Sequence, residues 1–329
     1  MAVFTPVTAA DLAGFLMRYD AGTATSFKGI AEGVQNSNFL VETTRARFIL
    51  TLYEDRVDID DLPWFLALMT HLADKGLPVP RPVVDRGGVA LQMLNGRPAC
   101  MIEFVTGVSV SEPSPDHCHA MGAALGRLHA ATTDFATPRA NSLGVAAWPA
   151  MADRCDGRFA EIDPRLAGII SGGLAATRDW PLGLPGGAMH TDLFPDNVLF
   201  SEHGVTGLID FYYACTDLRA YDYAVTHAAW CFSVAGDAHY PERAAALAAG
   251  YAETQGLSAA EIAALPRLGE GAALRFTLTR ASDWINPPAG AVVTRKDPMA
   301  FARRLQWYAL ATPQMVLGNF AAPATGLFE

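Results

Sequence analysis

The sequence predicts an α+β fold of two lobes, the first built on a mostly antiparallel sheet with one main helix and the second helical. Three observations support this fold. The chain has 329 residues, which is too long for one small hydrophobic core and sufficient for two lobes. Short β-rich runs recur up to about residue 104, and beyond Gly107 apolar residues recur at three- and four-residue steps. We therefore expect a β-rich lobe over residues 1–103 and a helical lobe over residues 104–329.

The first lobe is expected to begin with a short helix over residues 8–19. Thr8 suits the N-cap of this helix, and Asp11 completes a capping box. The β-rich runs that follow are separated by polar turns, and the second and third of them predict a hairpin. The expected strands are residues 26–33, 38–43, 47–53, 83–85, 89–94 and 99–104.

Leucine, phenylalanine and methionine at helical spacing predict the main helix of this lobe over residues 62–75. Gly76 ends the pattern, and Pro78, Pro80 and Pro82 favour an extended connection to the next strand. The second lobe begins with an amphipathic pattern and continues with helical patterns around two short strands, residues 198–200 and 207–209. Its helices are expected at residues 117–131, 221–233, 242–255, 258–268 and 271–284.

Composition restricts the function classes. The formal net charge of −10 argues against nucleic acid and against anionic membrane surfaces as partners, because both attract basic patches. Five scattered cysteines without a C-x-x-C pair indicate reduced thiols and a cytoplasmic protein. The first residues lack a basic segment followed by an apolar run, so we expect no secretory signal. A small molecule is the expected partner.

Residues 190–197 carry the strongest functional signal, H-T-D-L-F-P-D-N, and Asp210 follows in L-I-D-F. Phosphoryl transfer from ATP needs a carboxylate at the acceptor hydroxyl and oxygen ligands for Mg²⁺. The spacing H-x-D-x-x-x-x-N followed by a second Asp supplies both. We expect Asp192 to be the base or hydroxyl-orienting group, and Asn197 and Asp210 to bind the metal.

Two further residues are expected to support this loop. His190 is interpreted as a structural imidazole that holds the loop by hydrogen bonds. Asp222 is expected to bind the loop backbone.

Motifs across residues 26–284 resemble the small-molecule branch of the protein-kinase-like fold, which contains aminoglycoside, choline and homoserine kinases. L-P-V-P-R-P at 77–82, M-I-E-F-V-T-G at 101–107 and D-L-R-A-Y-D-Y-A at 217–224 carry this resemblance. G-I-A-E-G-V-Q-N-S-N-F at 29–39, F-I-L-T-L-Y-E at 48–54, I-D-F-Y-Y-A-C at 209–215 and A-L-R-F-T-L-T-R at 273–280 are similar to homoserine kinases more narrowly. The resemblance implies ATP and Mg²⁺ as cofactors.

The third strand departs from most kinases of this fold. They carry a Lys there that pairs with a Glu in the next helix, whereas Thr51 and Phe65 occupy these positions. Loss of both charges is electrostatically coherent, because one buried charge without its partner is costly. Lys28 and the backbone of Gly29 to Gly33 are then the candidates for contacting the phosphates.

The resemblance places adenine at the backbone of Glu103 and Val105. An amino-acid acceptor needs an Arg for its carboxylate, because the guanidinium fork matches a carboxylate. Arg275 and Arg280 are the candidates, and their spacing turns them about 140° apart on a helix. Tyr212 and Asp217 are candidates for the acceptor pocket.

The catalytic motif predicts an ATP-dependent phosphotransferase, and the resemblance implies that it acts on the side-chain hydroxyl of L-homoserine, in threonine biosynthesis. One alternative is a kinase for another small alcohol, such as an aminoglycoside, choline or a sugar. The other is an inactive nucleotide-binding pseudokinase, favoured by the missing Lys and Glu but opposed by the intact Asp192, Asn197 and Asp210.

Overall fold

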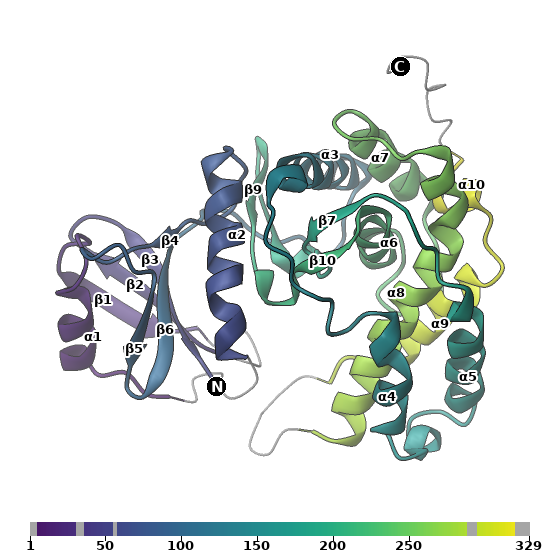
Figure 1. Ribbon diagram of the computed structural model, residues 1–329, viewed down its shortest axis with the longest axis horizontal. Helices are drawn as coiled ribbons and strands as arrows, with labels where there is room; N and C mark the ends of the chain where they lie inside the picture. Colours follow the sequence, from purple (N-terminus) through teal and green to yellow (C-terminus); the bar gives the residue numbers. More distant parts are fainter. Residues whose placement is uncertain (1–4, 31–35, 55–57, 288–294, 320–329) are drawn as a thin grey trace. The chain divides into compact units, whose positions relative to one another are not determined.

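The computed structural model describes residues 5–30, 36–54, 58–287 and 295–319 (Figure 1). The chain divides into two compact units. The first ends at Gly107 and the second begins at Val108. The first unit contains an antiparallel sheet and the second is mostly helical, so the predicted α+β fold is confirmed.

The first unit is built on one antiparallel sheet. Its strands are β1 (Ala24–Gly29), β2 (Asn36–Thr43), β3 (Arg47–Tyr53), β4 (Pro82–Val83), β5 (Leu91–Leu94) and β6 (Arg97–Glu103). They are ordered β1-β2-β3-β6-β4, and β5 pairs with β6. The predicted hairpin is confirmed as β2 and β3, which pair in register from Asn36 with Tyr53 to Glu42 with Arg47.

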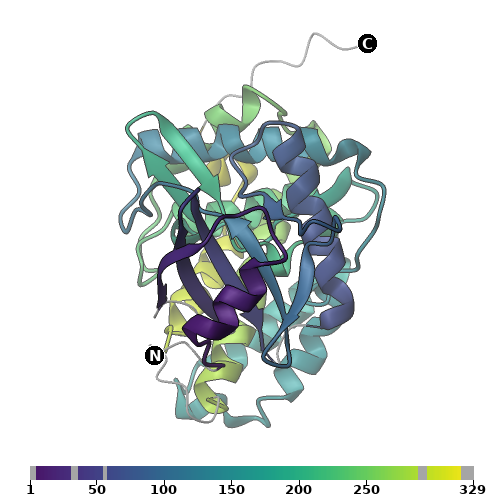
Figure 2. The same cartoon turned by 90° about the vertical axis from the view of Figure 1, so that its left-hand side faces the viewer.

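Helix α1 (Ala9–Leu16) covers one face of this sheet (Figure 2). The predicted capping box is confirmed, because the Asp11 amide donates to Thr8 Oγ1 and the Thr8 amide donates to Asp11 Oδ2. Leu12 and Phe15 belong to the same buried cluster as Leu50 and Leu52, which alternate along β3. The period of two along the strand thus supplies the apolar face that α1 buries.

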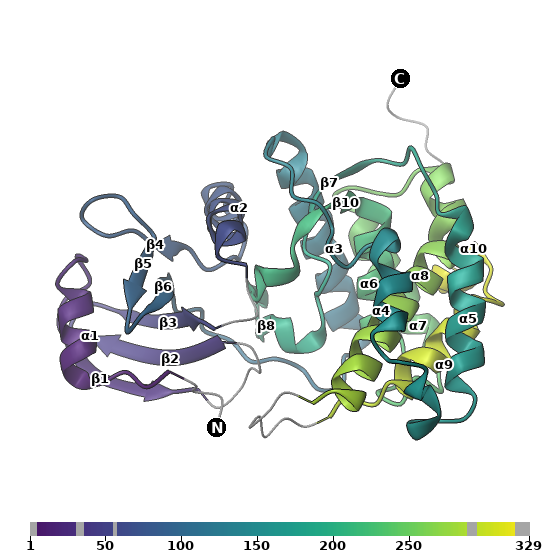
Figure 3. The same ribbon diagram turned by 60° about the horizontal axis from the view of Figure 1, so that its bottom comes forward.

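Helix α2 (Leu62–Asp74) lies alongside the sheet (Figure 3) and confirms the predicted main helix. Pro63 occupies its first turn, where a missing amide hydrogen is tolerated. The apolar residues at helical spacing are buried, including Phe65, Met69 and Leu72.

The second unit contains the remaining helices and two small antiparallel sheets. The described helices are α3 (Pro115–Ala131), α4 (Trp148–Asp153), α5 (Leu166–Ala176), α6 (Arg219–Trp230), α7 (Pro241–Ala252), α8 (Ala259–Ile285), α9 (Met299–Tyr308) and α10 (Pro313–Val316). One sheet pairs β7 (Gly186–Met189) with β10 (Cys215–Leu218), and the other pairs β8 (Val198–Ser201) with β9 (Gly204–Leu208). Helix α3 packs against α7, and α8 packs against both α6 and α9.

The expectation of two helices over residues 258–268 and 271–284 is wrong, because α8 runs unbroken through both. Glycines there do not end the helix; they allow close packing. A Cβ atom would lie 2.2 Å from the Tyr308 ring at Gly269, and 2.4 Å from the Trp180 ring at Gly271. Tertiary packing therefore overrides the local helix-breaking signal.

The five cysteines are buried and none forms a disulfide. Within the described ranges, no helix has the length and apolar character needed to cross a bilayer.

We expect Gly122→Ala to lower the free energy of unfolding by about 1–3 kcal/mol, the usual cost of overpacking a core. Gly122 lies where α3 packs against α7, and a Cβ atom there would be 2.1 Å from the carbonyl oxygen of Leu247. Urea denaturation would measure the change. Gly168→Ala in the open part of α5 is the control, because nothing lies within 4 Å of its Cβ position. Equal effects of the two substitutions would contradict this packing.

Candidate active site

The loop between β7 and β8 and the end of β9 bring Asp192, Asn197 and Asp210 together. Asn197 Nδ2 donates to the main-chain oxygen of Asp192 at 2.8 Å and to Asp192 Oδ2 at 3.2 Å. The amide of Ile209, which precedes Asp210, donates to the Asn197 carbonyl at 3.0 Å. Asn197 thus joins the two segments, because its side chain binds Asp192 in the loop and its carbonyl binds the end of β9.

The orientation of the Asn197 amide suits a metal ligand. Both of its hydrogen bonds to Asp192 use Nδ2, which identifies this end of the amide as the donor. The oxygen Oδ1 is left for another partner. An amide oxygen in this position is the kind of ligand that Mg²⁺ accepts.

Thr191 has a backbone conformation that β-branched residues rarely adopt, with φ of 58°. Three contacts hold it there. Its amide donates to Asp222 Oδ1 at 2.7 Å, and its hydroxyl donates to the Tyr213 carbonyl at 2.9 Å. Arg275 Nη1 donates to its carbonyl oxygen at 2.6 Å. Every polar group of Thr191 is therefore fixed, and this sets the direction in which the next residue, Asp192, leaves the strand.

Asp222 on α6 is the fully buried anchor of this loop. Its carboxylate accepts from the amides of His190 and Thr191 and from the Nε2 atom of His129. Burial opposes its ionisation, but these hydrogen bonds and the nearby imidazoles hold its pKa below the usual value. The predicted role of Asp222 in binding the loop backbone is confirmed.

His190 is held as a neutral imidazole. Nε2 lies 3.0 Å from the Ile209 carbonyl, and Nδ1 lies 3.3 Å from the Asp192 amide, so Nε2 donates and Nδ1 accepts. Burial lowers the pKa of His190 to about 4. A second proton, on Nδ1, would face the hydrogen of the Asp192 amide, so this contact also favours the neutral imidazole. The predicted structural role of His190 is confirmed.

The carboxylates of the site repel one another. Desolvation raises the pKa of Asp192 to about 7. The charge of Arg275 opposes this change, and those of Asp210 and Asp196 add to it. The pKa of Asp210 is also raised, by desolvation and by Asp196, while the Tyr212 amide opposes the change. Asp210 is itself exposed and has φ of 65°, a conformation that Asp tolerates.

This donor set fits a divalent cation that completes its coordination elsewhere. In the part of the chain that the structure describes, no three His, Cys, Asp or Glu side chains form a metal cluster. Asn197 and Asp210 would supply only part of an oxygen shell. Mg²⁺ suits such a site, because it keeps waters and takes phosphate oxygens as ligands.

The two expected arginines have different surroundings. Arg275 is buried and its Nη1 is bound to Thr191, so its position serves the loop backbone. Arg280 is half-buried, with its guanidinium 4.5 Å from the Phe301 ring centre and Nη1 donating to the Asp297 carbonyl at 3.2 Å. Both arginines are on α8, and the structure separates their roles.

The expected acceptor-pocket residues lie before β10 and within it. Tyr212 is in the short turn after Asp210. Asp217 is in β10 and accepts from Asn141 Nδ2 at 2.5 Å and from the Leu218 amide at 2.7 Å. Burial raises the pKa of Asp217, and these hydrogen bonds oppose the change. The Asn141 contact was not predicted, because 76 residues separate the two side chains.

The first unit holds the expected nucleotide contacts. Lys28 is exposed at the end of β1, where Gly29 pairs with Phe39. Glu103 ends β6 and Val105 follows it. Gly33 lies outside the described residues.

Thr51 and Phe65 are both uncharged and occupy the positions where most kinases of this fold carry Lys and Glu. Thr51 is buried in β3 and its hydroxyl donates to Asn38 Oδ1 at 2.8 Å. Phe65 is buried in α2. The Thr51 hydroxyl thus makes an uncharged hydrogen bond between β3 and β2, at a position where a buried lysine would need an ion pair.

Two groups near the loop had no sequence signal. Lys296 lies 3.3 Å from Asp196 Oδ2, across 100 residues. Arg304 on α9 is buried, with 4% of its surface exposed. Neither belongs to a motif, so only the folded chain reveals them.

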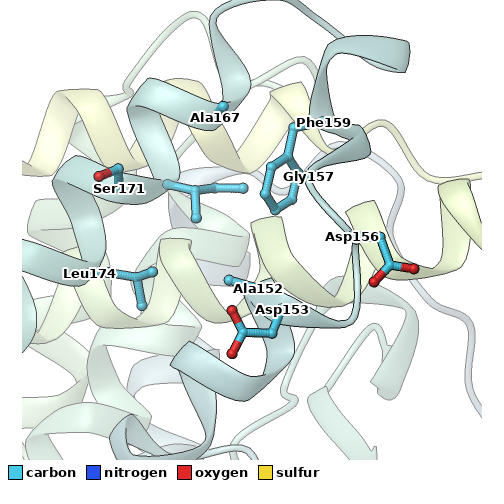
Figure 4. Close-up of a pocket in the computed structure, with 9 residues that line it drawn as sticks. Ala152, Asp153, Asp156, Gly157, Phe159, Ala167, Ser171 and Leu174 are labelled. Atoms are coloured by element: carbon cyan, nitrogen blue, oxygen red, sulfur yellow. The ribbon is translucent and has the colours of Figure 1, made fainter.

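A surface hollow of about 430 Å³ lies apart from these residues (Figure 4). Helices α4 and α5 contribute to its lining, which includes Phe159, Ile170 and Leu174 and the carboxylates of Asp153 and Asp156. None of its lining residues is a Lys or Arg, so it offers no side-chain cation for a phosphate.

Comparisons with known proteins show the family of this chain. Residues 26–261 match the family described as "Phosphotransferase enzyme family". The chain is 52% identical to "Homoserine kinase" of Xanthobacter autotrophicus over 309 residues, which cover 94% of this chain and 96% of that protein. It is also 52% identical to "Homoserine kinase" of Rhodopseudomonas palustris, over 93% of this chain and 94% of that one.

Solved structures share the fold. "Amicoumacin kinase hAmiN in complex with AMP-PNP, Ca2+ and Ami" superposes with a TM-score of 0.68 at 14% identity, covering 92% of this chain and 93% of that chain. A "microcompartment-associated aminopropanol kinase" gives 0.62 at 19% identity, over 97% of this chain and all of that one. The predicted protein-kinase-like fold is confirmed.

We expect the His190 imidazole to stay neutral down to about pH 4, because its low pKa follows from burial. The unfolded chain takes up this proton near the ordinary pKa of about 6.5. Stability from this group is therefore complete above that pH and falls as the pH drops towards 4. Histidine NMR of the folded protein would measure the midpoint, and a value near 6.5 would contradict the hydrogen-bonded neutral form.

Proposed function

This chain belongs to the phosphotransferase enzyme family and, within it, to the homoserine kinases, and on that premise we propose that it transfers the γ-phosphoryl group of ATP to the hydroxyl of L-homoserine. The observation that carries the proposal is that hydrogen bonds join the loop of Asp192 and Asn197 to the end of β9, next to Asp210. Residues 1–103 would bind nucleotide, and residues 104–329 would carry catalysis and bind homoserine. The enzyme would act in the cytoplasm, in threonine biosynthesis.

Asn197 Oδ1 and the Asp210 carboxylate would hold Mg²⁺, which when bound neutralises charge on the phosphates. This assignment is supported by the amide orientation of Asn197 and by the repulsion among the site carboxylates. Lys28 and the backbone of Gly29 and Gly33 would contact the phosphates. The backbone of Glu103 and Val105 would contact adenine.

Asp192 would accept a hydrogen bond from the homoserine hydroxyl and orient its oxygen towards the γ-phosphorus. The new O–P bond forms as the bond to the β-phosphate oxygen breaks, and ADP leaves. Because the transition state is loose, the hydroxyl proton moves to Asp192 late. The raised pKa of Asp192, about 7, suits a group that accepts this proton near neutral pH.

Two further polar side chains of the second unit would shape the acceptor pocket. Tyr212 follows the metal-binding Asp210 directly, and Asp217 is held by Asn141 on the neighbouring segment. We place these two residues at the amino-acid substrate. Arg275 is assigned to positioning the loop through Thr191.

Rates of ADP release with L-homoserine, choline, an aminoglycoside and a sugar test the proposed substrate. We expect kcat/KM for L-homoserine to exceed the others by at least about 10³-fold, the discrimination available to a site that pairs substrate polar groups. A higher value for another acceptor would overturn the substrate. Saturable Mg-ATP binding without ADP release for any acceptor would instead indicate a pseudokinase.

Asp192→Asn is expected to lower kcat by about 10³-fold, because general-base positioning contributes on this order. The dissociation constant for Mg-ATP should stay within about threefold, because the metal ligands are unchanged. Steady-state kinetics and calorimetry would measure both quantities. Glu202→Gln is the control, since this side chain is 85% exposed on the turn between β8 and β9. Undiminished turnover in Asp192→Asn would remove the proposed role.

A further inference from the structure

Arg304 is a buried cation whose hydrogen-bonding capacity is mostly unused. Nη2 donates to the Ser233 carbonyl at 2.8 Å. Nε and Nη1 have no hydrogen-bond partner among the residues described, and both are closed off from solvent. Arginine is seldom buried without an anion, because desolvating an unpaired charge is costly. The guanidinium therefore needs a partner that the described part of the chain does not supply.

The surroundings of Arg304 are apolar and cationic. Its guanidinium lies 4.2 Å from the ring centre of Phe301 and 5.6 Å from that of Phe232. Burial, together with the like charge of Arg280, lowers its pKa to about 10, and Tyr308 acts weakly in the opposite direction. Two guanidinium groups thus share the Phe301 ring, and their repulsion would be relieved by an anion bound to both.

This pair of arginines is connected to the catalytic loop. Phe301 contacts Phe194, two residues after Asp192, with 5.8 Å between ring centres. Phe194 also contacts Phe276 on α8, at 4.8 Å. Burial lowers the pKa of Arg280 to about 10, and Asp297, Asp192 and Asp196 partly oppose the change. Arg280 therefore lies within electrostatic range of the proposed base.

We propose that Arg304 and Arg280 bind the α-carboxylate of the amino-acid substrate, with Arg280 as the outer contact and Arg304 as the inner one. The inference rests on the proposed function, since it assigns a site to the substrate carboxylate. Arg280 is half-buried and would meet the carboxylate first. Nε and Nη1 of Arg304 are the donors that lack a partner among the described residues, and a carboxylate oxygen accepts a strong hydrogen bond from a guanidinium N–H.

The assignment also separates the arginines by task. Arg275 spends Nη1 on the Thr191 carbonyl and therefore positions the loop. Arg304 makes its one hydrogen bond with Nη2, and its Nε and Nη1 atoms have no partner among the described residues. Because both atoms are closed to solvent, a neighbouring ring or Arg304 itself must change rotamer before a carboxylate reaches them.

The test compares L-homoserine with 3-amino-1-propanol, which has the same chain and hydroxyl but no carboxylate. In Arg304→Met we expect KM for L-homoserine to rise by about 100-fold, the usual loss when a buried charged contact is removed. The values of kcat/KM for 3-amino-1-propanol and of KM for ATP should stay within about threefold. Arg280→Met should raise KM for L-homoserine by about tenfold, a smaller effect because Arg280 is more exposed than Arg304.

Arg303→Met is the matched control. Arg303 is the neighbour of Arg304 on α9, but its Nη1 donates to the Ala235 carbonyl at 2.7 Å and lies 3.7 Å from Asp297. Arg303→Met should leave unchanged the preference for L-homoserine, that is, the ratio of its kcat/KM to that for 3-amino-1-propanol. The melting temperature of ligand-free Arg304→Met should not fall, because an unpaired buried charge is removed. A merely structural arginine would lower stability and weaken both acceptors equally, and that result would overturn the proposal.

Calorimetric titration of L-homoserine into the protein with Mg-ADP separates this proposal from the proposed function. Binding to the wild type that is lost in Arg304→Met supports the carboxylate site, even if no phosphoryl transfer occurs and the proposed function fails. Phosphorylation of L-homoserine with an unchanged preference over 3-amino-1-propanol in Arg304→Met overturns the carboxylate site and leaves the function standing. Absence of any homoserine binding to the wild type overturns both.

Discussion

The left-handed backbone of Thr191 is the constraint on which the site depends. A β-branched residue adopts this conformation only where its surroundings fix it, at a cost on the order of 1–3 kcal/mol. Asp222 on α6, the turn at Tyr213 and Arg275 on α8 each hold one polar group of Thr191. The bend at Thr191 brings Asp192 out of β7 towards Asn197. The packing of α6 and α8 is therefore part of the chemistry, although neither helix contributes the proposed base or a proposed metal ligand.

The second unit carries two charge imbalances of opposite sign. Beyond desolvation, the charges of Asp210 and Asp196 raise the pKa of Asp192, and that of Asp196 raises the pKa of Asp210, so negative charge gathers around the loop. Arg280 and Arg304 share one aromatic ring and repel each other. A bound cation would relieve the first imbalance, and a carboxylate would relieve the second. The Mg²⁺ ion that accompanies ATP and the carboxylate of an amino acid would supply these two charges.

The sequence predicts most of the fold and the centre of the site, because both depend on short-range patterns. The capping box at Thr8, the β2–β3 hairpin and helix α2 are each encoded within a few residues. The H-x-D-x-x-x-x-N spacing likewise places Asp192 and Asn197 in one loop. What could not be predicted depends on tertiary contacts. The unbroken helix α8 needs the rings of Tyr308 and Trp180 to explain its glycines, and the isolation of Arg304 is visible only once its neighbours are known.

The most direct test of the central claim is anomalous diffraction from crystals grown with Mn²⁺, a non-hydrolysable ATP analogue and L-homoserine. We predict a manganese peak at coordination distance, about 2.0–2.3 Å, from both Asn197 Oδ1 and an Asp210 carboxylate oxygen. The Asp192 carboxylate should face the homoserine hydroxyl and remain outside the metal shell. A manganese site that lacks either Asn197 or Asp210, or that binds Asp192 in place of them, would contradict the account.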